Sequence, residues 1–247
     1  PRLFGDQIIY IINHAKDKII FVDLSFVPVL EGIAEQLDAS IKIVVMTDQE
    51  HMPDSKLENS LCFEVLIDGQ SDSYDWPDFE ENTASSLCYS SGTTGNPKAV
   101  LYSHRSTVLH AMTACATDGL GISGQDIVLP VVPMFHVNAW GIPYACALSG
   151  AKLVFPGAGM DGASVCELLE NEGVTITAGV PTVWLLLLGY ISENKKKLPD
   201  LERVIVGGAA VPQSMIEAFE NDLDCRCIHA WGMTEMTPLG TFNTLKP

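Results

Sequence analysis

The sequence predicts an α/β protein with mostly parallel sheets that are covered by helices on both faces. Two observations carry this prediction. Short apolar runs of strand length alternate with helix-like segments along most of the 247 residues. In addition, 47% of the residues are hydrophobic, which is enough to build a sizeable core. Strands that alternate with helices pair in parallel, and helices then cover both faces of the sheet.

The first 83 residues show a β-α-β rhythm and end in an acidic segment. Asp6 is placed to cap a helix with an apolar face of isoleucines. Residues 68–82 are rich in carboxylates and contain no lysine or arginine, so we expect an exposed connection there. We therefore predict a partial first α/β subdomain over residues 1–83 that ends in an acidic linker. Its other elements are strands at 18–23, 41–46 and 63–67 and a helix at 29–37.

From residue 84 to residue 247 the alternation resumes, and we predict a second α/β subdomain. Ser103 and Pro212 are residues typical of helix starts. The expected strands are residues 86–89, 127–131, 152–155, 174–178, 203–206 and 226–229. The expected helices are residues 104–117, 138–149, 162–171, 182–190 and 213–221.

Charge and hydrophobicity exclude two classes of partner. The net charge of −17 argues against binding the backbone of a nucleic acid, although a local site can still attract a small anion. Residues 127–151 and 173–192 are uncharged runs long enough to span a membrane. Prolines, glycines and polar residues interrupt both runs, which favours buried strand-loop-helix units and no membrane span.

The seven cysteines indicate reduced thiols in a cytoplasmic protein. Their number is odd and no C-x-x-C pair occurs, unlike in a disulfide framework. Cys225 and Cys227 would share one face of a strand, with His229 nearby, so a metal site is an alternative to plain burial. We favour buried strand cysteines.

The stretch YSSGTTGNPKAV, residues 89–100, has the composition of an anion-binding loop. Its glycines let backbone N–H groups approach a phosphate closely, its hydroxyl groups add donors, and Lys98 adds a positive charge. It is not a Walker A P-loop, because Lys98 follows a proline and precedes Ala99 rather than a serine or threonine. An ordinary glycine-rich turn remains the alternative when the loop is taken alone.

Several motifs together give this sequence a family resemblance. Residues 89–100 resemble the phosphate-binding signature of the adenylate-forming, or AMP-binding, enzymes, and AWGMTEM at 230–236 resembles their adenine and magnesium motif. VVPMFHVNAWG at 131–141 and VGGAAVP at 206–212 lie between them in the order of the family. The chain is most similar to short- and medium-chain fatty-acyl-CoA synthetases, a branch that includes 3-methylmercaptopropionate-CoA ligase. The implied fold is part of the large amino-terminal domain of such an enzyme.

The resemblance implies a two-step ligase reaction that uses ATP, Mg²⁺ and coenzyme A with a small carboxylic acid. His136 would stabilise charge near the acyl carboxylate rather than act as a base, and Glu235 would hold Mg²⁺. The residues implied for the phosphates are Ser91, Gly92, Thr93, Thr94, Gly95 and Lys98, with Thr234 at the α-phosphate. Those implied around the nucleotide and acyl-adenylate are Gly207, Gly208, Ala209, Trp231, Gly232 and Met233, and Trp184 resembles a gate of the fatty-acid tunnel.

Each of these roles has a plainer alternative in the residues themselves. Trp231 beside a glycine and His136 after Phe135 would otherwise be core residues, and Trp184 would be a helix-face aromatic in the core. Gly207, Gly208 and Ala209 would otherwise serve close packing.

The sequence departs from the family pattern in two respects. Ala99 replaces the glycine usual after Pro-Lys, which is costly only if this position needs a positive φ. The ribose-binding aspartate motif, the hinge and the small carboxy-terminal domain with its adenylation lysine have no counterpart in residues 1–247. We therefore interpret the chain as a fragment that is inactive alone.

Three functional hypotheses stay open at this point. The first is an acyl-CoA synthetase, and the second is another branch of the family, an aryl-CoA ligase or a peptide-synthetase adenylation domain. The third is a nucleotide-binding module without turnover. A homodimer is compatible with all three.

Overall fold

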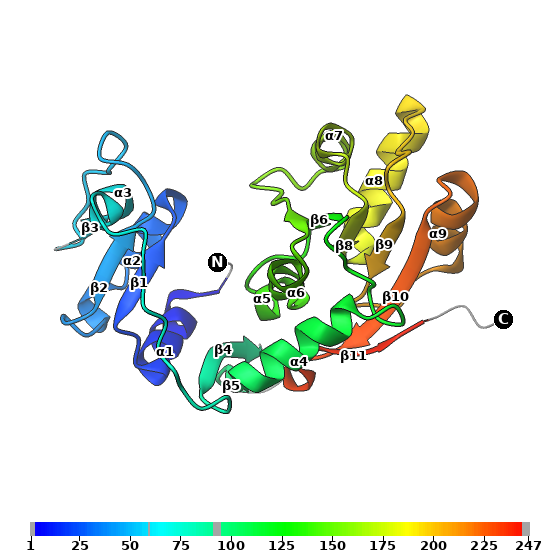
Figure 1. Ribbon diagram of the computed structural model, residues 1–247. Helices are drawn as coiled ribbons and strands as arrows, with labels where there is room; N and C mark the ends of the chain where they lie inside the picture. Colours follow the sequence, from blue (N-terminus) through cyan, green and yellow to red (C-terminus); the bar gives the residue numbers. More distant parts are fainter. Residues whose placement is uncertain (1–2, 59, 91–94, 244–247) are drawn as a thin grey trace. The chain divides into compact units, whose positions relative to one another are not determined.

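The structure is a computed structural model that describes residues 3–58, 60–90 and 95–243. The chain forms two compact units. One comprises Pro1–Phe79 with Tyr89–Ala99, and the other comprises Glu80–Cys88 with Val100–Pro247 (Figure 1). The subdomain boundary that the sequence suggests after residue 83 stays a prediction.

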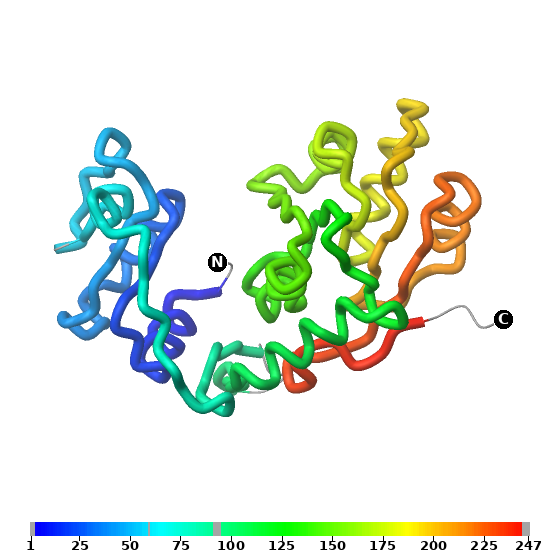
Figure 2. The backbone as a smooth tube through the Cα atoms, in the orientation of Figure 1, coloured from blue at the N-terminus to red at the C-terminus, as the bar shows by residue number. Residues whose placement is uncertain are grey.

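The first unit contains a small parallel sheet in the order β1-β2-β3. Its apolar core gathers side chains from the helices and the two longer strands, among them Ile12, Val22, Leu30 and Val45. The elements, which follow one another along the blue and cyan part of the tube in Figure 2, are α1 (Gly5–Ala15), β1 (Ile19–Val22), a 3₁₀ turn (Leu24–Phe26), α2 (Val27–Glu31), a 3₁₀ turn (Ala34–Gln36), β2 (Lys42–Val45), β3 (Leu61–Cys62) and α3 (Phe63–Ile67).

Three predictions for this unit were wrong. The run Phe63–Ile67 is a helix rather than a strand, because five apolar-rich residues carry no period that separates the two. The residue at the start of α1 is Phe4, and Asp6 lies inside the first turn, where its charge complements the helix dipole. The helix expected at 29–37 is two short pieces, α2 and the turn Ala34–Gln36.

The second unit is built on a six-stranded sheet in the order β11-β10-β9-β8-β6-β7. All neighbours pair in parallel except β10 and β11, which are antiparallel. The predicted class, a mostly parallel α/β sheet, is therefore confirmed. The strands are β6 (Ile127–Pro130), β7 (Lys152–Leu153), β8 (Ile176–Gly179), β9 (Arg203–Val206), β10 (Arg226–Gly232) and β11 (Leu239–Phe242).

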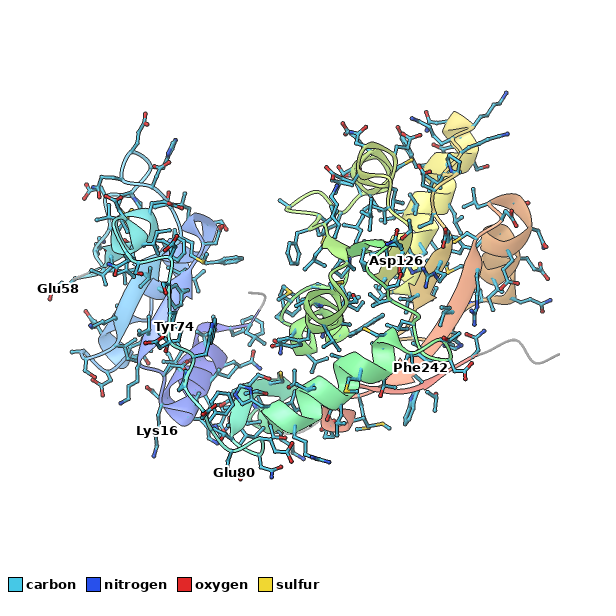
Figure 3. All side chains as sticks on the ribbon, in the orientation of Figure 1. Lys16, Glu58, Tyr74, Glu80, Asp126 and Phe242 are labelled. Carbon is cyan, nitrogen blue, oxygen red and sulfur yellow. The ribbon has the colours of Figure 1, made fainter. Side chains whose placement is uncertain are left out.

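Helices cover both faces of this sheet (Figure 1). Side chains alternate along β9, so that Val204 and Val206 join one core cluster and Ile205 joins the other. Phe242 of β11 packs against the second cluster (Figure 3). The first cluster includes residues of α7 (Gly162–Glu172) and α8 (Pro181–Asn194), and the second includes residues of α4 (His104–Cys115) and α6 (Ile142–Ser149).

The helix starts at Ser103 and Pro212 are confirmed. Ser103 caps α4, and its side chain accepts a hydrogen bond from the backbone N–H of Ser106. Pro212 precedes α9 (Gln213–Glu217), which continues as one π turn (Ala218–Asp222). Within the described residues, no helix combines the length and apolar character that crossing a membrane requires.

A two-stranded hairpin, β4 (Ala84–Ser90) with β5 (Lys98–Ser103), flanks the glycine-rich loop. The sequence indicated only the first of these strands. Ala99 lies inside β5 and has a negative φ, so alanine is free of left-handed strain there. The departure from the family glycine is therefore mild for the backbone.

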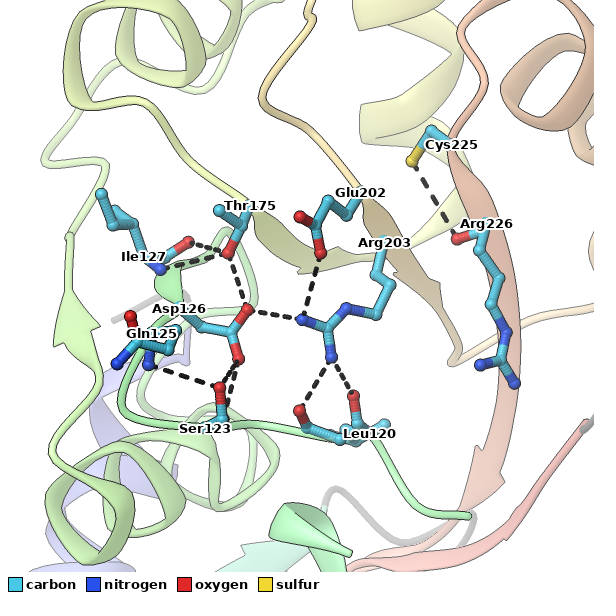
Figure 4. A network of polar contacts seen from close by, with 11 residues as sticks. Leu120, Ser123, Gln125, Asp126, Ile127, Thr175, Glu202, Arg203, Cys225 and Arg226 are labelled. Carbon is cyan, nitrogen blue, oxygen red and sulfur yellow. Dashed lines mark hydrogen bonds and ion pairs between the residues drawn. The ribbon is translucent and has the colours of Figure 1, made fainter. Parts of the chain in front are cut away.

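A buried polar network ties the amino ends of three neighbouring strands together (Figure 4). Asp126, just before β6, is 5% exposed and lies 2.5 Å from Nη2 of Arg203, the first residue of β9. Thr175, before β8, donates its hydroxyl hydrogen to the same carboxylate, and Ser123 donates through both its backbone N–H and its hydroxyl. Arg203 also donates to the carbonyl oxygens of Leu120 and Gly121. The ion pair is thus fully hydrogen-bonded at the edge opposite the strands' carboxyl ends.

Candidate active site

A pocket of about 160 Å³ lies at the carboxyl ends of the strands in the second unit. Ligands of parallel α/β sheets gather at this edge, where the loops after successive strands converge. The loops after β6, β9 and β10 all contribute to it. The lining residues are His136, Val137, Trp140, Gly207, Gly208, Ala230, Gly232, Met233, Thr234, Pro238 and Leu239.

One turn of left-handed helix follows His136 and shapes one wall of the pocket. This turn, α5 (Val137–Trp140), has φ between 43° and 57° at its four residues, although all carry side chains. The left-handed region costs a non-glycine residue roughly 1–2 kcal/mol. The helix predicted at 138–149 is therefore wrong over its first turn, and its regular part is α6. This turn places Val137 and Trp140 in the lining, and both side chains also pack in a small core cluster.

The glycines after β9 keep the pocket open. A Cβ atom on Gly207 would lie 3.0 Å from Cη2 of Trp140 and 3.0 Å from the carbonyl oxygen of Ala230. Gly208 has a φ of 78°, which favours glycine at that position. Ala209 is exposed and lies outside the lining. Two of the three residues that the sequence singled out here therefore meet the pocket.

Another wall of the pocket is formed by the end of β10 and the turn that follows it. Gly232, Met233 and Thr234 line the pocket, and Met233 donates its backbone N–H to the carbonyl oxygen of Pro238 at 2.9 Å. Trp231 is 55% exposed and lies outside the lining, on the strand beside the pocket. The turn is a short 3₁₀ helix, Thr234–Met236, that carries Glu235.

The exposed carboxylate of Glu235 is suited to be one ligand of a metal ion whose other ligands are the phosphates of a nucleotide. Magnesium in phosphate-transfer sites is held by one or two carboxylates together with substrate phosphates. A metal site built from protein ligands alone needs several such side chains close together. Among the residues that the structure describes, no group of three or more His, Cys, Asp or Glu could hold a metal ion.

Four of the six residues that the family resemblance implies for the phosphates lie outside the described residues. This applies to Ser91, Gly92, Thr93 and Thr94. Of the rest, Gly95 has a φ of 83°, and Lys98 is the first residue of β5. The positive φ at Gly95 agrees with the sequence argument that glycine serves the backbone conformation of this loop.

Trp184 and the cysteines lie in the core rather than in the pocket. Trp184 is fully buried and packs edge-to-face on Phe219, with ring centroids 6.2 Å apart. Its role in the acyl tunnel stays a prediction without support from the pocket lining. Cys225 and Cys227 belong to the same core cluster, and burial raises the pKa of the first thiol to about 12 and of the second to about 11. Both thiols are buried, as predicted, but only Cys227 lies in strand β10, and Cys225 directly precedes that strand.

Sequence reasoning missed several residues that line the pocket. Trp140, Val137, Pro238 and Leu239 belong to this group. Trp140 stands in the stretch PMFHVNAWG that was singled out, but only His136 was chosen from it. Pro238 and Leu239 follow the AWGMTEM stretch closely, yet nothing in the sequence alone shows that the chain turns back there as strand β11.

Replacing Gly232 by alanine is expected to distort the pocket. A Cβ atom there would lie 2.1 Å from the carbonyl oxygen of Pro238 and 2.9 Å from Cα of Leu239, and backbone atoms cannot swing aside. We expect a loss of about 2–3 kcal/mol of stability, the cost of overpacking a tight site. Urea unfolding of the variant measures it.

Gly240→Ala is the matched control in the same hairpin. Its Cβ atom would meet Cε of Met236 at 2.4 Å, the end of a flexible side chain that can move. We expect a loss below about 1 kcal/mol, in the range of tolerated substitutions. Equal losses in the two variants would contradict the backbone contact at Gly232.

These features define an α/β protein with a glycine-rich loop and a pocket at the carboxyl ends of its parallel strands. A family model described as "AMP-binding enzyme" matches residues 1–247. The chain belongs to this family of AMP-binding enzymes.

Individual relatives agree with the family. The chain is 52% identical over 244 residues to a medium-chain-fatty-acid–CoA ligase of Ectopseudomonas oleovorans, covering 99% of this chain and 45% of that protein. It is 49% identical to a 3-methylmercaptopropionyl-CoA ligase of Ruegeria lacuscaerulensis, covering 98% of this chain and 45% of that protein. The chain thus spans less than half the length of these curated relatives.

A solved structure shows the same fold. The anthranilate CoA ligase AuaEII in complex with anthranoyl-AMP superposes with a TM-score of 0.87 at 24% identity, covering 98% of this chain and 46% of that chain. At this identity the likeness supports the architecture alone.

Proposed function

We propose that this chain is part of an AMP-forming acyl-CoA synthetase, an acid–thiol ligase. It activates a short- or medium-chain fatty acid with ATP and transfers the acyl group to coenzyme A. The observation that carries the proposal is the pocket in which three stretches meet, represented by His136, Gly207–Gly208 and Gly232–Thr234. The 52% identity to a medium-chain-fatty-acid–CoA ligase supports the substrate class.

The first half-reaction needs positioning and charge neutralisation rather than a protein nucleophile. A carboxylate oxygen of the acid forms a bond to the α-phosphorus of ATP, and the bond from that phosphorus to the bridging oxygen breaks, so that pyrophosphate leaves. In the second half-reaction the sulfur of coenzyme A attacks the acyl carbon, and AMP leaves with the bridging oxygen. The thiol loses its proton in this step.

The residues around the turn after β10 would hold the nucleotide. Thr234 would donate a hydrogen bond to the α-phosphate, and Gly232 and Met233 would let the nucleotide approach the backbone. Trp231 would lie against the adenine, for which its exposed ring is available. Ser91, Gly92, Thr93, Thr94, Gly95 and Lys98 would bind the β- and γ-phosphates until pyrophosphate leaves.

The residues on the β6 and β9 side would hold the acyl end. His136 lines the pocket with an exposed side chain, where a ring N–H would stabilise charge on the acyl carboxylate and the α-phosphate. Gly207 and Gly208 would leave space for the acyl-adenylate, and the ring of Trp140 lines the pocket beside Gly207. Magnesium, bound by Glu235 and the phosphates, would offset their negative charge.

The partners are a carboxylic acid, ATP and coenzyme A, and a homodimer stays compatible with them. We also propose a cytoplasmic location, which the odd number of cysteines and the lack of a C-x-x-C pair favour.

Pyrophosphate release from the full-length protein tests the proposal. It is measured with ATP and Mg²⁺ on acetate, butyrate, 3-methylmercaptopropionate, octanoate, palmitate and benzoate, each with and without coenzyme A. We expect acid-dependent release and thioester formation, with the highest kcat/KM between butyrate and octanoate. A best acid that is aromatic would assign the protein to an aryl-CoA branch. Binding of an acyl-AMP analogue without release from any acid would indicate a binding module.

A further inference from the structure

Tyr102 is a buried tyrosine that none of the motifs includes. It lies on β5, is 6% exposed, and packs with Cys88 and Val137 in a small core cluster of the second unit. Trp140, whose side chain lines the pocket, is packed against the same cluster. A phenylalanine ring would fill this buried position equally well. The hydrogen-bond partner of the Tyr102 hydroxyl therefore indicates what the hydroxyl does beyond packing.

The Tyr102 hydroxyl donates a hydrogen bond to the backbone carbonyl oxygen of Thr234. This carbonyl is the first of the turn Thr234–Met236, and it also accepts from the backbone N–H of Thr237 at 3.4 Å. The contact joins positions 132 residues apart in the sequence. A 3₁₀ turn of three residues has weak internal hydrogen bonding. The hydrogen bond from Tyr102 therefore helps to hold this turn in place.

The environment of Tyr102 keeps its phenol protonated, so that the hydroxyl can donate a hydrogen bond. Burial raises the pKa of the Tyr102 phenol, and the neighbouring Cys88 thiol and Glu235 carboxylate raise it further. The phenol is consequently protonated across the neutral range.

We propose that Tyr102 is a positioning residue that holds the Thr234–Met236 turn so that Thr234 and Glu235 face the α-phosphate and magnesium of the bound nucleotide. The inference rests on the proposed function, because the nucleotide site is part of it. Tyr102 touches neither the substrate nor the metal and acts through the Thr234 carbonyl.

Tyr102→Phe tests the proposal in the full-length protein, because phenylalanine keeps the buried ring and removes only the hydroxyl. We expect the apparent affinities for Mg²⁺ and ATP in pyrophosphate release to fall about 5- to 10-fold, the range of one lost hydrogen bond. The KM for the acid should stay within about twofold, since the acyl wall of the pocket is unchanged. Tyr190→Phe on α8 is the matched control and should change none of these constants.

A double variant separates positioning from general packing. In a Glu235→Gln background, Tyr102→Phe should weaken the Mg²⁺-dependent binding of a non-hydrolysable ATP analogue by less than about twofold, because the two residues act through one turn. Calorimetry measures this binding without turnover. Full additivity of the two effects, or equal loss of acid and ATP affinities in Tyr102→Phe, would overturn the proposal.

The outcome remains distinguishable from failure of the proposed function. If wild-type protein releases no pyrophosphate with any acid, the ligase assignment fails, while the calorimetric comparison still decides the role of Tyr102. If wild-type protein is active and Tyr102→Phe retains its Mg²⁺ and ATP affinities, the ligase assignment stands and the positioning role is wrong.

Discussion

Glu235→Gln is expected to slow acid-dependent pyrophosphate release by roughly 100-fold or more, the range of losing a group that stabilises transition-state charge. Glutamine keeps the size and one acceptor oxygen but removes the negative charge that would bind magnesium. Glu235 is exposed at the surface of a short turn, so the change leaves no cavity and no buried unpaired group. The stability of the protein should therefore stay close to that of wild type.

The control for Glu235→Gln is another exposed glutamate in the same unit. Glu193→Gln on α8 changes the net charge equally and should leave the rate within about twofold, as surface substitutions usually do. The defect of Glu235→Gln should lessen as Mg²⁺ is raised, because weaker metal binding is overcome by mass action. A wild-type rate in Glu235→Gln would remove Glu235 from the metal site.

Asp126→Ala is expected to cost about 3–5 kcal/mol of stability, the range for removing one partner of a buried ion pair. The side chain of Arg203 is only 18% exposed and would remain charged beside the carbonyl oxygens of Leu120 and Gly121. The hydroxyl groups of Thr175 and Ser123 would lose their acceptor as well. Urea unfolding, followed by tryptophan fluorescence to which the buried Trp184 contributes, should show a large shift of the midpoint.

Two comparisons make this prediction specific. Glu172→Ala breaks the pair with Lys152, whose side chains are 38% and 53% exposed, and should cost less than about 1 kcal/mol. The double variant Asp126→Leu/Arg203→Met removes both charges and should be more stable than Asp126→Ala, because no buried charge is left unpaired. A loss below about 1 kcal/mol in Asp126→Ala would contradict the burial of this network.

The regular part of the fold was predictable because its elements have strong local signals. The strands β6, β8, β9 and β10 are apolar runs of the expected length, and Ser103 marks the start of α4 as a cap residue should. The short elements carry no such signal. Phe63–Ile67 has too few residues to show a period, and β11 exists only because it pairs with β10.

The site was predictable where the sequence resembles the AMP-binding enzymes. That resemblance pointed to His136, Thr234 and the glycines near them in the fold, and the structure brings these residues to one pocket. Trp140 depends on a left-handed turn, and Tyr102 acts through a hydrogen bond to a residue 132 positions away. Neither depends on a local pattern, so only the folded structure reveals them. Trp184 shows the reverse case, a resemblance in sequence that leads to a core position.

The fate of the carboxylate oxygens tests the central claim most directly. The full-length protein is given ATP, Mg²⁺, coenzyme A and octanoate labelled with ¹⁸O in both carboxylate oxygens, and the products are analysed by mass spectrometry. Activation through an acyl-adenylate predicts AMP that carries one ¹⁸O atom and pyrophosphate that carries none, because the attacking oxygen leaves with AMP. Labelled inorganic phosphate with ADP, or unlabelled AMP beside the thioester, would contradict the proposed chemistry.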